Sequence, residues 1–381
     1  MTMAAPRAEA SVRVWLRWLS IRDFRNLPRA DLEIPMEGLV VVGENGHGKT
    51  NLLEAIYYLQ LLRSIRGARD QDLVRFGAEG FHLAAEALGP GARELSVGFE
   101  RAGRRKRVRL GGAEVPRLSD AIGELPAVMF APRDVELVAG APGARRRYLD
   151  VALALTSRSY LAALQHYRGA LARRNAALRA VMRGARNDDR AAVWEPALAR
   201  AGAVLWSERL AWVGRAAPRF AELCEAIGER APVSIRYASA VEPGDGLEAR
   251  LAAALASRRA LDARRGITHA GPHRDELVLS LDGRELRAFG SAGQQRTASI
   301  ALRILEAETL REASGGAPLF LLDDPFAELD ARRSGRILEL LAREGLGQVV
   351  LAVPRETDIP GGLGRLDRRR MTDGVLAPGA S

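Results

Sequence analysis

The residues best suited to chemistry form a glycine-rich loop between an apolar run and a helical pattern. They match the pattern G-x-x-x-x-G-K-[ST], in which backbone N–H groups turn inward around phosphate oxygens and the following helix adds its positive end. Lys49 is expected to reach the β- and γ-phosphates, and Thr50 to offer a hydroxyl to the metal ion. The sequence therefore predicts a site for ATP and Mg²⁺ formed by Gly43, Glu44, Asn45, Gly46, His47, Gly48, Lys49 and Thr50.

The identity of Lys49 is informative because this chain almost never uses lysine. Of 57 lysines and arginines, only Lys49 and Lys106 are lysines. A planar guanidinium fits a phosphate cradle poorly, whereas a compact ammonium fits it well. The lysine therefore favours a phosphate-binding loop over an ordinary glycine-rich turn between a strand and a helix.

A second group of polar residues follows an apolar run far downstream. Residues 319–322 indicate a buried strand, and Asp323 and Asp324 come directly after it. In hydrolases with such a loop, we expect the acid strand beside the strand that carries the loop, with its first carboxylate holding Mg²⁺. Asp323 would then hold the metal ion with Thr50, and Asp324 would be the catalytic residue that polarises the attacking water. The alternative is that the two acids begin a turn before Pro325.

A third motif opens a helix 32 residues before Asp323. Its pattern, Ser-x-Gly-Gln-Gln, resembles the signature loop of ABC-type ATPases, which caps the γ-phosphate bound by the other subunit. Ser291 also suits the N-cap of that helix, where its hydroxyl accepts a backbone hydrogen bond. Residues 328–330 (Glu-Leu-Asp) resemble the D-loop of the same class. The predicted nucleotide-binding residues of the signature loop are Ser291, Gly293, Gln294 and Gln295.

Other polar residues are further candidates. Arg25 precedes the phosphate loop and is placed near the base or the α-phosphate by one interpretation. The basic run 104–107 (Arg-Arg-Lys-Arg) lies at the turn of a predicted hairpin, where it either contacts DNA or forms a solvated face. His269 and His273 have the spacing of a helical metal pair, but the Gly-Pro between them argues against a regular helix and so against a metal site.

The elements that must position these residues fall in three sections. Residues 144–264 have helical periodicity and few glycines or prolines, whereas the sections on either side alternate strands and helices. The helix after the phosphate loop is expected to show one apolar face. The tail from residue 354 has no clear pattern. Strands are predicted at 14–24, 39–42, 95–99, 108–110, 276–281, 319–322 and 348–353, and helices at 51–62, 293–313 and 332–343.

This order predicts an α/β fold: an ABC-type P-loop ATPase head assembled from both chain ends, with an inserted, mainly helical domain. The phosphate loop and the signature loop are 242 residues apart, counted from Lys49 to Ser291, so one head needs both ends. The predicted domains are residues 1–143 and 267–381 for the two parts of the head, and residues 144–266 for the insert.

Composition sets the class of partner and the compartment. The formal net charge of +10 favours a polyanion, nucleic acid first and an anionic membrane second, although an arginine-rich compositional drift would give the same charge. No apolar run approaches the roughly 18 residues that a membrane span needs, and charges interrupt the N-terminus where a signal peptide would lie. The single Cys224 excludes an internal disulfide and a cysteine-based zinc site, so a cytoplasmic location is expected.

Further short motifs are spread over most of the chain. With the phosphate loop, they include residues 24–26 (Phe-Arg-Asn), 131–134 (Ala-Pro-Arg-Asp), 145–150 (Arg-Arg-Arg-Tyr-Leu-Asp), 271–275 (Gly-Pro-His-Arg-Asp) and 291–296 (Ser-Ala-Gly-Gln-Gln-Arg). In these motifs the chain resembles the RecF family of bacterial recombination mediators, which are related to the heads of SMC proteins. The resemblance implies a weak ATPase that binds DNA, either double-stranded or at gapped junctions with single strands, as an ATP-induced homodimer. It also implies RecR and RecO-like partners, loading of RecA at single-stranded gaps, and roles in repair, recombination, replication and the SOS response.

Two segments depart from the family pattern, and three other functions stay open. Residues 64–67 and 353–355 differ from it, so the Q-loop residue and the residue that senses the γ-phosphate are unassigned. The alternatives are an SMC-like head, an ABC transporter ATPase, and a DNA clamp that binds ATP without hydrolysing it. An insert of about 120 residues is too short for the long coiled coil of an SMC protein. Transporter heads usually carry a shorter insert and a Ser-Gly-Gly-Gln signature.

Overall fold

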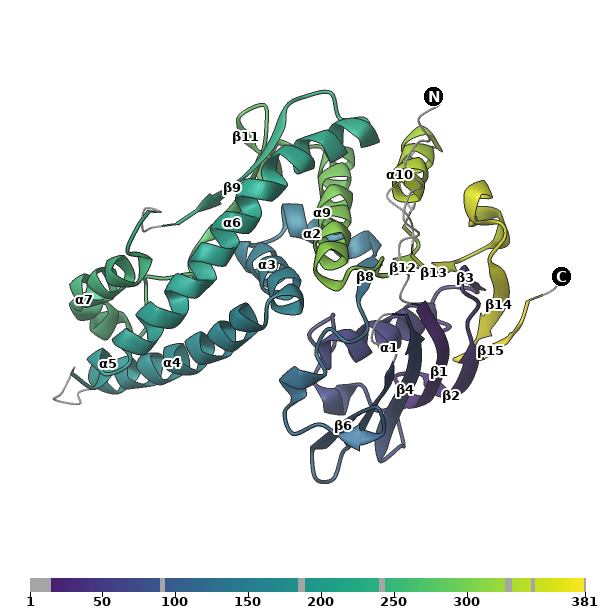
Figure 1. Ribbon diagram of the computed structural model, residues 1–381, viewed down its shortest axis with the longest axis horizontal. Coiled ribbons are helices and arrows are strands. Elements are labelled where there is room, and N and C mark those ends of the chain that lie inside the picture. Colours follow the sequence, from purple (N-terminus) through teal and green to yellow (C-terminus); the bar gives the residue numbers. More distant parts are fainter. Residues whose placement is uncertain are drawn as a thin grey trace, which may run out of the picture. The chain divides into compact units, whose positions relative to one another are not determined.

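The computed structural model describes residues 15–89, 93–183, 189–239, 244–325, 331–343 and 347–379. They belong to two compact units (Figure 1). The first contains the residues up to 132 and those from 306 onward, and the second contains residues 133–305. The first unit is therefore assembled from both chain ends, as predicted for the head, and the division between the units falls inside helix α9 (Ala292–Ser314).

A largely parallel sheet forms one layer of the first unit. Its strand order is β15-β14-β3-β13-β12-β8, and every pair is parallel except β14 with β15. All residues of β3 and β13 are buried, as expected for central strands of a parallel sheet. The bounds are β3 Gly38–Val42, β8 Ala127–Phe130, β12 Leu319–Asp323, β13 Val349–Val353, β14 Asp367–Thr372 and β15 Val375–Pro378.

An antiparallel sheet forms the second layer. Its strand order is β2-β1-β4-β5-β6-β7, and the predicted hairpin is the pair β5–β6. Apolar residues alternate with polar ones along β1, β4, β5 and β6, so one face packs into the core and the other carries the polar side chains. The bounds are β1 Trp15–Phe24, β2 Leu27–Glu33, β4 Gly80–Leu88, β5 Arg93–Glu100, β6 Arg105–Leu110 and β7 Ala113–Glu114.

Helix α1 (Lys49–Leu61) contacts strands of both sheets and is buried nearly all round. The prediction of a helix with one apolar face was wrong in this respect, because every residue from Leu52 to Leu61 is buried. The polar members need partners there: Glu54 binds Arg25, and the side-chain oxygen of Gln60 accepts the backbone N–H of Ala127. No element was predicted in the tail, but the structure has two strands there, β14 and β15. Helix α10 (Ala331–Arg343) lies between β12 and β13 in sequence.

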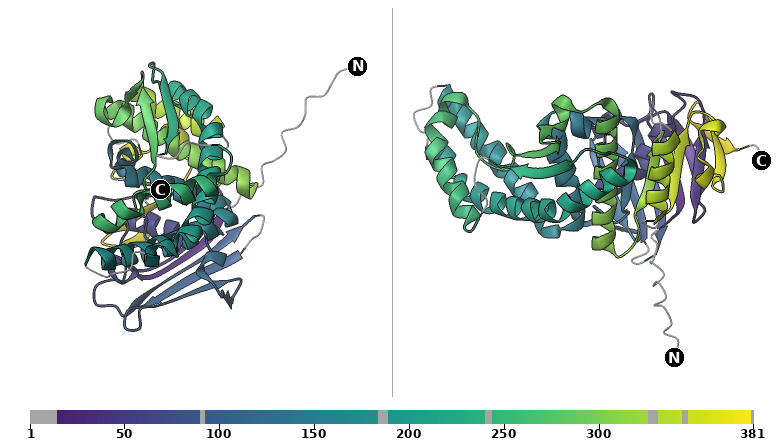
Figure 2. Two further views of the ribbon diagram at one scale, coloured as in Figure 1. Left: turned by 90° about the vertical axis from the view of Figure 1, so that its left-hand side faces the viewer. Right: turned by 90° about the horizontal axis from the view of Figure 1, so that it is seen from above.

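The second unit is mainly helical, with a small sheet. The predicted helical section 144–264 starts with two helices, α3 (Pro142–Thr156) and α4 (Arg158–Met182), separated at Ser157. The long helices α4 and α6 (Glu195–Ile227) lie side by side (Figure 2). None of the described helices is long and apolar enough to cross a membrane. The helices are α2 Glu136–Ala139, α3 Pro142–Thr156, α4 Arg158–Met182, α5 Asp189–Ala192, α6 Glu195–Ile227, α7 Leu247–Arg265 and α8 Leu286–Phe289; short 3₁₀ turns cover Asp70–Asp72, Leu118–Asp120, Pro132–Val135, Glu356–Asp358 and Gly361–Leu363.

The small sheet explains why the compact units differ from the predicted domain boundaries. Strand β9 (Val233–Ala238), which the sequence did not reveal, pairs antiparallel with β10 (Glu276–Leu281) and so joins the predicted insert to a segment expected in the head. The third strand, β11 (Arg284–Glu285), closes the hairpin. The second unit consequently runs from 133 to 305 rather than from 144 to 266.

Several family motif residues form a buried polar network in the second unit. The guanidinium of Arg209 donates to Asp150 at 2.7 Å, to the hydroxyl of Tyr160 at 2.9 Å and to the carbonyl oxygen of Pro272 at 2.8 Å. Removing one partner of such a buried network leaves an unpaired charge, which costs roughly 3–5 kcal/mol. Asp150 and Pro272, which belong to two of the family motifs, therefore help to hold the helical core together through Arg209.

The two histidines of the apparent metal pair belong to the same core. Both lie after the end of α7, outside any helix. The ring Nδ1 of His269 lies 2.7 Å from Asp262, and that of His273 lies 2.6 Å from the hydroxyl of Tyr167. Burial lowers the pKa of His273 to about 4, so the ring is neutral at pH 7.

Candidate nucleotide-binding site

The phosphate loop connects buried β3 to α1, which fixes both of its ends. The ammonium of Lys49 donates to the main-chain oxygens of Gly43 at 2.5 Å and Glu44 at 2.9 Å. Burial lowers the pKa of Lys49, and the carboxylates of Asp323 and Asp324 act in the opposite direction. The compact ammonium thus holds the loop curled, as a phosphate cradle requires.

Close packing beneath the loop explains one of its glycines. Gly48 has φ +110°, and a Cβ atom there would lie 2.6 Å from the side-chain oxygen of Asn26. Asn26 is held in place because the side chain of Asn51 donates to that same oxygen at 2.8 Å. Only glycine meets both demands, so the turn between β1 and β2 fixes the shape of the loop from below.

The paired acids meet the phosphate loop at the end of β12. The hydroxyl of Thr50 donates to a carboxylate oxygen of Asp323 at 3.0 Å, across 273 residues of sequence. Burial raises the pKa of Asp323, an effect that the Thr50 hydrogen bond opposes. Asp324 has φ +44° and its N–H donates to Ala352 at 2.9 Å, so this strained residue turns away from the line of the strand.

The strand order corrects one expectation about these acids. We expected the acid strand directly beside the strand that carries the loop, but β13 lies between β3 and β12. Thr50 and Asp323 still meet because parallel strands end at one edge of the sheet, and α1 begins after the end of β3 and contacts β12 and β13. The predicted pairing of Thr50 with Asp323 therefore does not depend on adjacent strands.

An open hollow of about 260 Å³ lies over the loop and the acids, and it includes residues that the sequence reasoning missed. Arg66 reaches it from the segment after α1, where its guanidinium donates to Asn51 at 2.9 Å and lies 3.3 Å from Glu54. The segment 64–67 departs from the family pattern, so no motif signalled this arginine. The lining residues are Asn45, Gly46, Gly48, Lys49, Thr50, Asn51, Arg66, Asp323, Asp324 and Pro354.

Arg25, the other arginine considered for the nucleotide, is engaged elsewhere. Its guanidinium forms two hydrogen bonds with the buried carboxylate of Glu54, at 3.1 and 3.2 Å, and a third with the carbonyl oxygen of Asp72 at 3.4 Å. It is not among the residues that line the hollow. Arg25 thus supports α1 from the β1–β2 turn.

The tip of the phosphate loop is tied to the turn between β14 and β15. The N–H of Asp373 donates to Nδ1 of His47 at 2.8 Å, and the N–H of Gly374 donates to the carbonyl oxygen of His47 at 2.8 Å. Gly374 has φ +82°, and a Cβ there would lie 2.1 Å from the carbonyl oxygen of Asn26. Three distant segments therefore interlock around His47.

The signature loop lies in the second unit and is held by local contacts. Ser291 accepts the N–H of Gln294 at 3.3 Å, and the side-chain oxygen of Gln294 accepts the N–H of Ser291 at 2.9 Å. This reciprocal pair is a capping box at the start of α9, so the N-cap interpretation of Ser291 is confirmed. Gln295 donates to the carbonyl oxygens of Leu286 and Arg287, both at 3.2 Å. Gly293 is the second residue of α9, and the D-loop at 328–330 lies outside the described residues.

The basic run 104–107 does not act as one patch. The ammonium of Lys106 points into the core side, where it donates to the carbonyl oxygen of Leu62 at 2.7 Å and pairs with Asp70 at 2.7 Å. Arg105 and Arg107, on either side of it in β6, are exposed on the opposite face of the strand. Both lysines of the chain therefore bind main-chain oxygens at the two ends of α1.

The fold and site define a class of protein: the P-loop ATPase heads of the RecF, RecN and SMC type. Residues 15–357 match the family described as RecF/RecN/SMC N terminal domain. The Smc head domain of Pyrococcus furiosus, solved with an extended coiled coil, shares the fold with a TM-score of 0.55 at 16% identity, over 95% of each chain.

Within that class the chain belongs to the RecF family. It is 36% identical to the DNA replication and repair protein RecF of Roseiflexus castenholzii, over 96% of this chain and 100% of the relative. The solved structure of the recombination mediator protein RecF-ATP in the RecFOR pathway superimposes with a TM-score of 0.89 at 27% identity, covering 98% of this chain and 100% of the other. The α/β head with a helical insert is thereby confirmed.

Proposed function

We propose that this chain is an ATP-dependent DNA-binding protein of recombinational repair and replication restart. One observation carries the proposal: Thr50 and Asp323 meet at 3.0 Å beside the buried Lys49, in a loop shaped to cradle phosphates. DNA as the second ligand is supported by membership of a family whose curated relatives are DNA replication and repair proteins.

The residues present fit Mg²⁺ as the companion of ATP. The hydroxyl oxygen of Thr50 and the carboxylate oxygen of Asp323 are the hard ligands that this ion prefers, and they lie at hydrogen-bond distance from each other. Bound there, Mg²⁺ would neutralise charge on the phosphate oxygens. Asp324, which lines the same hollow, is placed to accept a proton from an attacking water, so slow hydrolysis of ATP is part of the proposal.

The nucleotide would be shared between two copies of the chain. The phosphate loop already offers one cradle, and a single triphosphate has little use for a second at the start of α9. In a two-fold dimer, each signature loop closes the site of the other copy through the same surface, which is an isologous arrangement. Charge-assisted bonds from Ser291 and its neighbours to the γ-phosphate would then exist only in the ATP-bound dimer.

The family relationship also supports specific partners. A solved relative at 27% identity is described as a recombination mediator in the RecFOR pathway. We infer that this chain acts in the cytoplasm with RecR and RecO-like proteins on duplex DNA and gapped junctions, and helps to load RecA at single-stranded gaps.

The test is DNA binding with ATP, with ADP and without nucleotide, over a salt series, with ATP turnover measured in the same samples. We expect retention of DNA with ATP alone, and loss of that retention in Lys49→Arg, because a guanidinium cannot occupy the narrow cradle. Equal DNA binding in all three nucleotide states would contradict the proposal. Retention without any turnover would show a clamp that does not hydrolyse ATP.

A further inference from the structure

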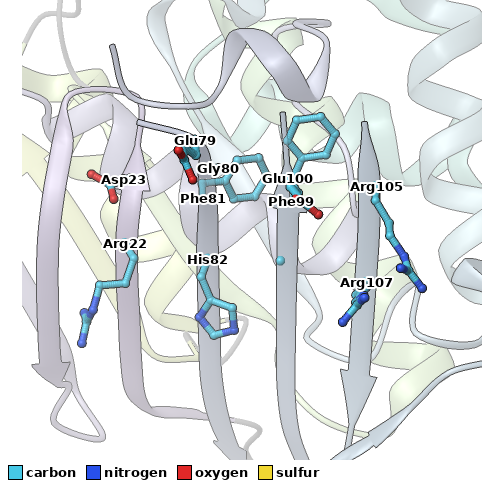
Figure 3. Close-up of a pocket in the computed structure, with 11 residues that line it drawn as sticks. Arg22, Asp23, Glu79, Gly80, Phe81, His82, Phe99, Glu100, Arg105 and Arg107 are labelled. Atoms are coloured by element: carbon cyan, nitrogen blue, oxygen red, sulfur yellow. The ribbon is translucent and has the colours of Figure 1, made fainter. Parts of the chain in front are cut away.

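A second hollow on the first unit lies on the outer face of the antiparallel sheet, and it shares no lining residue with the hollow over the phosphate loop. It has a volume of about 450 Å³, compared with about 260 Å³ over the phosphate loop. Figure 3 shows Arg22 of β1, His82 of β4 and Arg107 of β6 at one end of it. The site described above uses none of these residues.

Strand register places these side chains in a single row. Arg22 of β1 is opposite His82 of β4, His82 is opposite Gly98 of β5, and Gly98 is opposite Arg107 of β6. Arg29 of β2 extends the row, since it is opposite Arg22. At about 4.8 Å between strands, the row is about 19 Å long. Arg109, two residues after Arg107, begins a second row on the same face. We call this set of residues the arginine band: Arg22, Arg29, His82, Arg107 and Arg109.

The floor of the hollow is low because its central residues are small. Gly98 stands between His82 and Arg107, and Ser96 and Ala84 occupy the next row. Packing does not require glycine here: a Cβ at Gly98 would be 3.6 Å from the nearest atom, the Cδ2 of His82, which is an ordinary contact. The missing side chain leaves space between the basic residues.

The charge of the arginine band is only partly compensated. Arg22 and Arg29 share one carboxylate, Asp31, at 2.9 and 3.2 Å. Among the residues that the structure describes, no carboxylate lies within ion-pair distance of Arg107 or Arg109. On β7, however, Glu114 is opposite Arg109 in the strand register. Four arginines therefore stand against two acids, Asp31 and Glu114, and the band keeps a net positive charge.

The pKa of His82 reflects the positive charge of the band. Its pKa is lowered, first by burial and then by the charges of Arg22 and Arg109. The neutral ring avoids a further positive charge in the band. An anion placed beside it would reverse part of that effect.

Acids limit the hollow at the other end. Asp23, Glu79 and Glu100 line it there, beyond the row that contains His82, together with one arginine, Arg105, which is opposite Glu100 (Figure 3). Asp23 is already paired with Arg75 at 2.6 Å. These carboxylates repel a polyanion and would confine it to the direction of the row, across the strands.

We propose that the arginine band binds the phosphate backbone of double-stranded DNA. A backbone lying across the strands would meet an arginine from each of β2, β1 and β6 and the ring of His82 on β4, over a floor low enough for close approach. Phe81 and Phe99, the aromatic residues of the hollow, are 4% and 6% exposed, so they offer no platform for stacked bases. Contacts to phosphates without stacking favour a duplex over a single strand. This inference rests on the proposed DNA-binding function and specifies the surface used.

The test measures the binding of duplex and, separately, of single-stranded DNA by the full chain with ATP over a salt series. Arg107→Ala and Arg109→Ala should each weaken binding and reduce the slope of log affinity against log salt by about 1, because each removes one phosphate contact. Gly98→Glu should weaken it more, since it fills the hollow and adds a negative charge. Arg365→Ala, an exposed arginine of the same unit outside the band, is the matched control and should leave the slope unchanged.

The outcomes separate the band from the function on which it rests. Wild-type protein that binds no DNA with ATP would overturn both. DNA binding by the wild type, with the same slope and affinity in Arg107→Ala, Arg109→Ala and Gly98→Glu at unaltered thermal unfolding, would overturn the band alone. A loss confined to single-stranded DNA would overturn the choice of duplex. As a second readout, duplex should raise the pKa of His82, followed by NMR of the ring.

Discussion

The phosphate loop and the signature loop both lie at helix N-termini, yet they are held in opposite ways. The phosphate loop bonds to residues that are hundreds of positions away: Thr50 to Asp323 and His47 to Asp373. The bonds of the signature loop stay almost entirely within nine residues, apart from a 3.5 Å contact between Gln294 and Glu229.

This difference indicates which of the two loops already has its binding shape in a single chain. A loop fixed by several distant segments keeps its shape before ATP arrives, so little ordering entropy remains to be lost on binding. A loop held mainly by its own capping box has a fixed helix start but few bonds to distant parts of the chain. In the proposed dimer, the first loop is preformed and the second gains its phosphate contacts only across the two-fold axis.

The sharpest test of this comparison mixes two inactive variants. Lys49→Ala should destroy the preformed loop and Ser291→Arg the capping loop, so each alone should lack ATP turnover. Mixed in equal amounts, half of the dimers would be mixed and each would hold one intact site, so about a quarter of wild-type turnover should return. If no turnover returned although crosslinking shows mixed dimers, the claim that each signature loop completes the site of the other copy would be wrong.

Separate roles for the two acids give the next largest effect. Asp324→Asn should slow turnover by about 100-fold while ATP still binds, because only the proton acceptor is lost. Asp323→Asn should instead weaken the Mg²⁺-dependent part of ATP binding. Filter binding of ATP with and without Mg²⁺, beside a turnover assay, distinguishes them. The same loss of ATP binding in both variants would contradict this division.

Removing the tie at the tip of the phosphate loop should have a smaller effect. His47→Leu deletes the acceptor for the N–H of Asp373, a hydrogen bond that contributes roughly 1 kcal/mol, so ATP affinity should fall about five-fold. Asp373→Asn keeps the N–H and is the matched control. Calorimetric titration of both variants measures the effect, and equal affinities would show that the tie does not shape the loop.

The smallest effect is expected in the unliganded signature loop. Ser291→Ala removes the N-cap of α9 and should lower the free energy of unfolding by about 1 kcal/mol. Ser291→Thr retains a capping hydroxyl and should lose less. Urea unfolding without nucleotide measures both. If Ser291→Ala lowered the free energy of unfolding by several kcal/mol, the loop would also stabilise parts of the fold outside α9.

Local patterns explain how much of the site the sequence revealed. Each of the phosphate loop, the paired acids and the capping serine is encoded within a few consecutive residues, and α9 begins at Ala292, one residue before its predicted start. The tie between His47 and Asp373 spans 326 residues and depends on a hairpin in the tail, which gave no readable pattern. Strand β14 is a case in point: Asp367–Thr372 contains three consecutive arginines, yet it pairs with buried β3.

Burial explains why the rest of the fold was harder to predict. Periodicity reports which face of an element meets water, and α1 has almost no such face because it contacts both sheets. Strand β9 was missed for a different reason: Val233–Ala238 is short and only one of its residues is fully buried. Pairing with β10, not its own pattern, makes it a strand.

Helix α1 has a consequence for how two ligands would influence each other. Its 13 residues span about 20 Å, from Lys49 in the phosphate loop to the end where Lys106 binds the carbonyl oxygen of Leu62. Lys106 belongs to β6, where its neighbour Arg107 is part of the arginine band. If DNA binds to that band, helix α1 physically connects the DNA site with the ATP site. Thermodynamic reciprocity then requires that DNA tightens ATP by the same factor by which ATP tightens DNA, so a length of duplex would itself act as the signal to load nucleotide.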